Sequence, residues 1–213
     1  MTLQDFKYEF DIHYNNIASD IAPGLNDHEI STFLTEAQES LVLDMIQGNK
    51  IENLENTEVV KEQLAKLIVE KSLSEVFTSN NKLYKYSRLY ELPSDVLQII
   101  YEGIYKGEPC NKIIKVVPIT HDNVAKLLDN PFKGPTKQAL RLTISEDKVE
   151  IISRLVGDSD RYVIRYIRNP KPIILDRSII RGITGTSDSE LHESLHMNIL
   201  SRAVMMAKQS WLN

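Results

Sequence analysis

The spacing of apolar residues changes twice along this chain, and that change constrains the fold more than any other feature. From Ile30 to Ile46 the apolar residues recur at the three- and four-residue steps of one helical face. From Leu140 to Ile151 they alternate with polar residues, as in strands that bury one face. After residue 187 the helical spacing returns. The order of helices, sheet and helix predicts an α+β fold.

The N-terminal part is predicted to be helical. Asn26 and Glu29 have the spacing of a capping box, in which each side chain bonds the backbone amide of the other residue. A helix should begin there and end at Gly48, preceded by a shorter amphipathic helix from Phe6 to Ala18. Further apolar residues that favour another helix are Val59, Val60, Leu64, Leu67 and Ile68.

A β-rich segment is expected from about Leu83. Residues 140–151 have the pattern of a hairpin, and residues 161–168 that of a further strand, which together predict an antiparallel meander. Pro170 and Pro172 cannot donate to a sheet, so residues 171–175 should lie at an edge or outside it. The other predicted elements are a strand at 113–117 and a short helix at 121–128.

The C-terminal segment is predicted to form a helix that returns to the N-terminal helices. Ser187 and Glu190 have the spacing of a second capping box. A lone terminal helix must bury its apolar stripe, and packing it on the first helices makes the β segment an insertion. We therefore expect a helical bundle with an inserted antiparallel β-sheet subdomain. The expected parts are a helical part at 1–80, the β-rich subdomain at 81–186 and the returning helix at 187–213.

The apolar stripe of the last helix is the candidate interface. It contains Leu191, Leu195 and Ile199, and Trp211 follows close to the chain end. A tryptophan there is well placed to anchor in a neighbouring subunit, because aromatic residues dominate binding energy at interfaces. Closure of the chain's own core is the alternative role for the same residues.

Charge is unevenly distributed. The formal net charge is −5, yet residues 1–80 carry 5 Lys and Arg against 15 Asp and Glu, while residues 131–182 carry 11 against 6. Such segregation can give complementary faces that pair between copies, a basic surface for phosphate, or merely solvated faces. No apolar stretch approaches the roughly 20 residues that cross a bilayer, and the start is acidic rather than a signal peptide, so we expect synthesis in the cytoplasm.

The segment His192-Glu193-Ser194-Leu195-His196 matches H-E-x-x-H. On a helix this spacing places two imidazoles on one face, where they bind zinc while the glutamate activates water. A catalytic zinc needs a third protein ligand, and residues 197–213 contain no His, Asp, Glu or Cys. With a single cysteine, Cys110, the chain has neither an internal disulfide nor a four-thiolate zinc site. A zinc peptidase using His192, Glu193 and His196 is therefore an alternative to a non-catalytic role.

A nucleic-acid-binding module is the third possibility. Aromatic and basic residues together can stack on single-stranded nucleic acid, although tyrosines that alternate along a strand are more often half-buried sheet residues. No known reader motif accompanies them here. The tyrosines are Tyr84, Tyr86, Tyr90, Tyr101 and Tyr105, and the basic residues between them are Lys85 and Arg88, with Lys82 just before.

Four stretches carry a resemblance to a known family. They are EISTFLTEAQ at 29–38, LPSD at 92–95, YIRNPKPIIL at 166–175 and ELHESLHMNILSRAV at 190–204. In these stretches, and in their order along the chain, the sequence resembles the head-to-tail connector, or neck-ring, proteins of tailed bacteriophages of the crAss-like type.

The resemblance implies a structural virion protein without catalytic activity, cofactor or metal. Such proteins form rings, commonly of twelve copies, in the phage neck between the portal and further neck or tail components, around the channel for double-stranded DNA. The implied partners are copies of the chain itself, the portal protein and other neck or tail rings, with no membrane. Acidic helices and a basic β segment can complement one another around such a ring. We expect the acidic helical part to contribute to the channel, because an electronegative lumen lets DNA slide.

Overall fold

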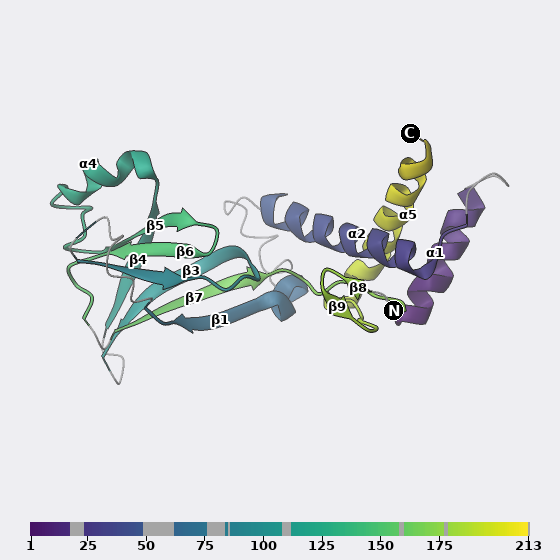
Figure 1. The fold of residues 1–213 in the computed structure, drawn as a ribbon, viewed down its shortest axis with the longest axis horizontal. Helices are drawn as coiled ribbons and strands as arrows, with labels where there is room; N and C mark the ends of the chain where they lie inside the picture. The colour runs from purple at the N-terminus through teal and green to yellow at the C-terminus, as the bar shows by residue number, and fades with distance from the viewer. Residues whose placement is uncertain are drawn as a thin grey trace. The chain divides into compact units, whose positions relative to one another are not determined.

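A curled seven-stranded sheet is the largest element of the computed structural model (Figure 1). The structure describes residues 1–17, 24–48, 62–75, 84, 86–107, 112–157, 160–176 and 179–212. Contacts divide the chain into two units, one made of Met1–Leu67 with Asn169–Asn213 and the other of Ile68–Arg168. We call them the helical unit and the sheet unit. No helix in the described ranges is long and apolar enough to span a bilayer.

The strands of the sheet unit do not follow their order in the chain. All neighbours are antiparallel except β4 and β5, which are parallel and joined by η2 (His121–Asn123) and α4 (Val124–Leu128). A parallel pair needs such a crossover, because a tight turn reverses the chain direction. In spatial order the strands are β1 (Ile68–Leu73), β7 (Arg161–Arg168), β3 (Val96–Lys106), β4 (Lys112–Ile119), β5 (Ala139–Ser145), β6 (Lys148–Ile152) and β2 (Ser87–Glu91).

The sheet curls until its two edges meet. A β-bridge links Glu75, just after β1, to Tyr90 of β2, the strand at the opposite edge. An ion pair between Arg88 and Glu75, at 3.2 Å, lies beside this bridge. The curl leaves an inner face that is closed from solvent and an outer face that is open to it.

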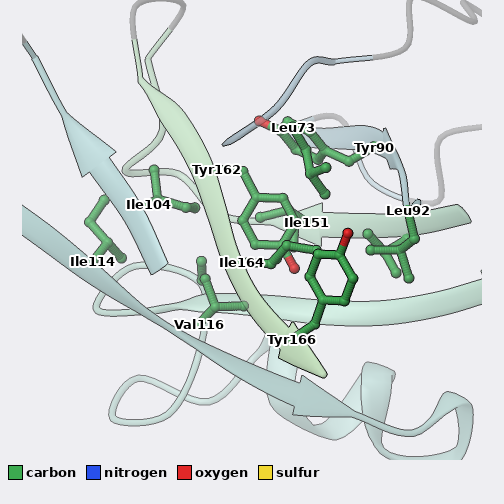
Figure 2. Close-up of a cluster of buried hydrophobic side chains, with 12 residues drawn as sticks. Leu73, Tyr90, Leu92, Ile104, Ile114, Val116, Ile151, Tyr162, Ile164 and Tyr166 are labelled. Carbon is green, nitrogen blue, oxygen red and sulfur yellow. The ribbon is translucent and has the colours of Figure 1, made fainter. Parts of the chain in front are cut away.

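The core of the sheet unit fills that inner face. Tyr162, Ile164 and Tyr166 alternate along β7 and point into the middle of the cluster (Figure 2). The rings of Tyr90 and Tyr162 lie 4.9 Å apart. Burial, with Glu102 beside it, raises the pKa of Tyr162 well above its ordinary value, so the hydroxyl stays protonated and donates to Glu102 at 2.8 Å.

The helical unit packs three α-helices, an extended segment and a hairpin. Helix α5 (His196–Leu212) packs on both α1 (Leu3–Ile17) and α2 (Asp27–Gly48). The start of α2 is the predicted capping box: Asn26 N–H donates to Glu29 at 2.8 Å, and Glu29 N–H donates to Asn26 Oδ1 at 2.9 Å. The buried apolar side chains of the three helices include Phe6, Phe10, Ile30, Leu34, Ile199 and Ala203.

A two-residue turn joins β8 (Ile179–Ile180) to β9 (Ile183–Thr184). Its central residues are Arg181, with φ of 52°, and Gly182, with φ of 78°. Positive φ at both positions is the type I′ geometry that matches the twist of a hairpin. Arginine seldom adopts this conformation, and its guanidinium pairs with Glu39 of α2.

The predicted fold class is wrong. The chain is mostly a curled seven-stranded sheet with short, scattered helices, not a helical bundle with an inserted antiparallel β-sheet subdomain. The sheet also contains a parallel pair. Periodicity shows which face of a helix is buried but not what covers it, and α2 is covered in part by an extended segment instead of helices alone.

Several local predictions also differ from the structure. Ile68 begins β1 rather than ending a helix, and Val59 and Val60 lie outside the described residues. The strand at 161–168 pairs with β1 and β3, not with the 140–151 hairpin, so the meander is wrong. The division of the chain into parts at 1–80, 81–186 and 187–213 is a prediction about which segments fold and act separately. It stays a prediction.

Candidate assembly surfaces

The H-E-x-x-H segment does not lie on one α-helix. His192 has an extended backbone (φ −63°, ψ 144°) and caps the 3₁₀ turn η3 (Glu193–Leu195), its Nδ1 accepting from the Ser194 amide at 3.3 Å. Helix α5 begins only at His196. The predicted Ser187 and Glu190 cap is therefore wrong, and the Glu190 carboxylate instead accepts from the Lys171 amide at 3.0 Å. His192 works as a local cap.

His196 is buried, and both of its ring nitrogens have partners. Nδ1 lies 2.9 Å from the Met1 ammonium, Nε2 lies 3.3 Å from the Leu191 carbonyl, and the ring of Phe6 packs with its centroid 5.2 Å away. An ammonium only donates, so Nδ1 accepts and Nε2–H donates to the carbonyl. Burial, then the nearby ammonium, lowers the pKa of His196 below its ordinary value. A neutral ring engaged on both sides has no lone pair for zinc.

No metal centre can be assembled around this segment from the residues that the structure describes. Nowhere in those ranges do three His, Cys, Asp or Glu side chains come together in a way that could hold an ion. Cys110 lies outside the described residues. The geometry of His192 and His196 thus gives the zinc-peptidase alternative no support.

Three of the four predicted interface residues lie in the core of the helical unit. Leu191, Leu195 and Ile199 are buried within the single chain. The side chain of Trp211 lies outside the part that the structure describes. Contact of these four residues with a neighbouring subunit stays a prediction.

Three polar residues of α2 tie the helix to an extended segment, an arrangement that sequence reasoning missed. Ser31 Oγ accepts from the Leu175 amide at 2.9 Å, Thr35 Oγ1 from the Ile173 amide at 3.1 Å, and Gln38 Nε2 donates to the Lys171 carbonyl at 2.7 Å. Every second residue of the extended segment thus meets the same face of α2, where positions 31, 35 and 38 align.

The same contacts join three of the stretches that carry the family resemblance. The hydroxyl of Ser189, next to the 190–204 stretch, donates to Gln38 Oε1 at 2.6 Å and accepts from the Leu191 amide at 3.3 Å. Ser31, Thr35 and Gln38 are all buried, so each hydrogen bond replaces one that water would make. The sequence signal was available: polar residues at helical spacing inside an apolar stripe require buried partners.

The tyrosines considered for nucleic-acid stacking do not form one surface. Tyr90 is buried in the core, whereas Tyr84 and Tyr86 lie together near β2 with ring centroids 5.9 Å apart. Arg154 donates to the Tyr84 hydroxyl at 2.9 Å and lies over the Tyr86 ring. Arg154 accompanies Tyr84 and Tyr86, Arg165 accompanies Tyr101, and the buried Tyr90 can contact no base, so the five tyrosines do not act as one stacking track.

The outer face of the sheet carries exposed apolar and charged side chains. Across β1, β7 and β3, Glu70 pairs with Arg165, and Arg165 lies over the ring of Tyr101, 5.5 Å from its centroid. Tyr101 lies over Gly103, where an added Cβ would come within 2.9 Å of its hydroxyl. Ile113 of β4 extends this surface and is 49% exposed. An open face of this kind is suited to a protein partner.

Comparison with known proteins gives whole-chain matches. The family model of phage tail ring protein 3/4 matches residues 1–212. Ring protein 3 of Bacteroides phage crAss001 is 36% identical, with 97% of this chain and 95% of that protein covered. Ring protein 4/5 of the same phage is 33% identical, with 99% of this chain and 94% of that protein covered.

Proposed function

The chain belongs to the phage tail ring protein 3/4 family, and from that premise we propose that its copies close into a ring in the neck of the virion. As a member of this family it has a structural ring role in the virion. The finer proposal is that the ring joins the portal to downstream neck or tail components around the DNA channel.

The match over residues 1–212 is the observation that carries the proposal, because it includes both units. The charges of the units agree with it. The helical unit holds 9 Lys and Arg against 17 Asp and Glu, a formal charge of −8, and the sheet unit holds 16 against 13, a charge of +3. Opposite charges on two parts of one subunit favour a head-to-tail contact, which closes into a ring when repeated.

We further propose twelve copies and an acidic channel lined in part by the helical unit. A negative lumen repels the phosphate backbone and lets packaged DNA slide, whereas lysines and arginines would hold it by releasing counterions. No catalytic step is proposed, and the engagement of both His196 nitrogens supports that choice.

Native mass spectrometry of the purified chain, alone and mixed with the portal protein of the same phage, tests the proposal. We expect a metal-free closed oligomer, of twelve copies, in at least one sample. Electron microscopy of the mixture should then show that ring seated on the portal. A monomer in both samples would contradict the ring, and a monomer carrying one zinc ion would favour the peptidase instead.

A further inference from the structure

One loop of the sheet unit holds a phenylalanine out in solvent. Phe132, between α4 and β5, is 77% exposed, more than the other exposed large apolar side chains of the described residues. Exposing a large aromatic ring to water forgoes the stabilisation that its burial would give. Its position therefore calls for a role outside the core of its own unit.

The loop is fixed by its own hydrogen bonds. Asn130 Oδ1 accepts from the amides of Phe132 and Lys133, both at 2.9 Å, and the Asn130 carbonyl accepts from the Gly134 amide at 2.9 Å. Gln138 Nε2 donates to the Lys133 carbonyl at 2.7 Å. The backbone that presents Phe132 is thus set before any partner arrives.

Gly134 is required for this shape. A Cβ at that position would lie 2.3 Å from the Asn130 carbonyl oxygen and 2.9 Å from that of Leu127, and both are backbone atoms that cannot move aside cheaply. Lys137 places its Nζ 5.6 Å from the centroid of the Phe132 ring, within reach of a cation–π contact. The exposed ring and the ammonium therefore form one recognition element.

A rigid, exposed aromatic side chain is the kind of group that dominates interface energies. Such anchors fill pockets near the centre of a contact and account for most of its affinity. Binding through a loop that is already ordered avoids most of the entropy cost of fixing it. Segment 121–138 carries three lysines and two aspartates: Lys133 follows Phe132 directly, Asp129 lies three residues before it and Lys137 five residues after it.

The outer stripe of α2 has the complementary character. Phe33 is half-buried and Leu43 is 40% exposed, and the exposed carboxylates of Glu29 and Glu36 flank Phe33 on the same helical face. The opposite face of α2 carries the contacts to the extended segment, while Arg202 of α5 reaches the C-terminal half of the stripe at Ser40 and Asp44 and leaves the half around Phe33 open. The outer stripe is therefore apolar and acidic, and it belongs to the unit of charge −8.

We propose that the Phe132 loop of one copy docks on the outer stripe of α2 in the next copy, with Phe132 against Phe33 and with Lys133 beside Glu36. The proposal rests on the ring function above and names the contact between its subunits. It joins two different surfaces, so it is head-to-tail and can be repeated around a ring.

The first test is the variant Phe132→Ala, compared with Ile144→Ala, which truncates another exposed apolar residue of the same unit. Mass photometry of a dilution series, with portal present if the wild type needs it, gives the subunit affinity. We expect about a thirtyfold or greater loss for Phe132→Ala and less than about threefold for Ile144→Ala. Far-ultraviolet circular dichroism and the thermal midpoint check that both variants are folded.

A charge exchange identifies the partner surface. Glu36→Lys and Lys133→Glu should each weaken closure about tenfold, and the double variant should recover most of that loss, because it restores an opposite pair across the contact. The hydrogen bonds that hold the Phe132 loop and the capping box of α2 do not use the side chain of Glu36 or of Lys133.

The outcomes separate the two proposals. If the wild type closes and Phe132→Ala closes equally well, the docking inference is overturned and the ring remains. If the single charge variants weaken closure without recovery in the double variant, α2 is not the partner surface. A wild type that stays monomeric with and without portal overturns the ring, and the docking inference with it.

Discussion

At the residue scale, the Thr35 hydroxyl joins α2 to the extended segment through buried hydrogen bonds. Its Oγ1 accepts from the Ile173 amide at 3.1 Å and donates to the Ser31 carbonyl at 2.8 Å, and both bonds are buried. Thr35→Val keeps the shape but leaves the amide without an acceptor. We expect the free energy of unfolding to fall by about 1–3 kcal/mol, measured by denaturant titration.

Thr32→Val is the matched control for that change. The Thr32 hydroxyl lies on the same helix and bonds the His28 carbonyl one turn back, in an exposed position. Its removal should change the free energy of unfolding by less than about 0.5 kcal/mol. Equal losses in the two variants would show that the bond to Ile173 adds nothing beyond a local effect.

His196 should make the stability of the chain depend on pH. Burial holds its folded-state pKa below the unfolded value of 6.5, so the unfolded chain binds more protons as the pH falls below neutrality. The stability from neutral His196 is complete above pH 6.5 and is lost as the pH falls through the lowered folded pKa. The facing groups are the Met1 ammonium, the Leu191 carbonyl and, at longer range, Glu193 and Lys66.

Denaturant titrations between pH 7.5 and 5 measure this effect. His196→Gln cannot titrate, so its stability should fall less over that range than the stability of the wild type. His28→Gln, on the exposed face of α2, serves as the control and should keep the wild-type slope. A His196→Gln slope identical to the wild type would assign the pH dependence to other groups.

At the element scale, Gly134 fixes the loop that carries Phe132. In Gly134→Ala the new Cβ would overlap the Asn130 carbonyl oxygen, so the loop must open or the neighbouring α4 must shift. We expect the thermal unfolding midpoint to drop, by an amount that corresponds to about 2 kcal/mol. Gly157→Ala is the control, because its Cβ would meet Asp160 at an ordinary 3.7 Å; a similar drop there would argue against the steric explanation.

Whether a helix start or a strand can be predicted from sequence depends on whether its partners are local. The capping box of Asn26 and Glu29 is present as predicted, because both partners are local and solvent-exposed. The identical spacing at Ser187 and Glu190 failed because Glu190 binds the Lys171 amide, a partner far along the chain. Ile68 became a strand residue because it pairs with Ile167 of β7, and no local pattern contains that information.

The residues of the candidate surfaces also divide into those that the sequence could predict and those that it could not. Apolar spacing placed Leu191, Leu195 and Ile199 on one helical face, and all three are buried, although Leu191 and Leu195 precede α5. The positions of Thr35 and Gln38 inside an apolar stripe indicate that they need buried partners, but the partners themselves could not be derived, because they lie more than a hundred residues away. Phe132 also escaped prediction, since only the folded loop shows that its ring is exposed.

At the scale of the whole molecule, the sheet unit has the features of an independently folding part. Its core cluster is drawn entirely from residues between 68 and 168. Its two ends lie side by side, because Ile68 at the start of β1 pairs with Ile167 at the end of β7. An inserted unit with adjacent ends can be cut out without pulling its terminal strands apart.

We therefore expect a fragment of residues 68–168 to fold alone. Its two-dimensional amide NMR spectrum should be dispersed, and it should unfold in one cooperative transition. Tyr162→Ala in the fragment, which removes a fully buried ring from the core, should abolish that transition, because truncating a buried aromatic costs about 3–5 kcal/mol, a large share of the stability of a small domain. A fragment with a collapsed spectrum would mean that the sheet unit needs the helical unit to fold, and the chain would then have to be treated as one cooperative whole.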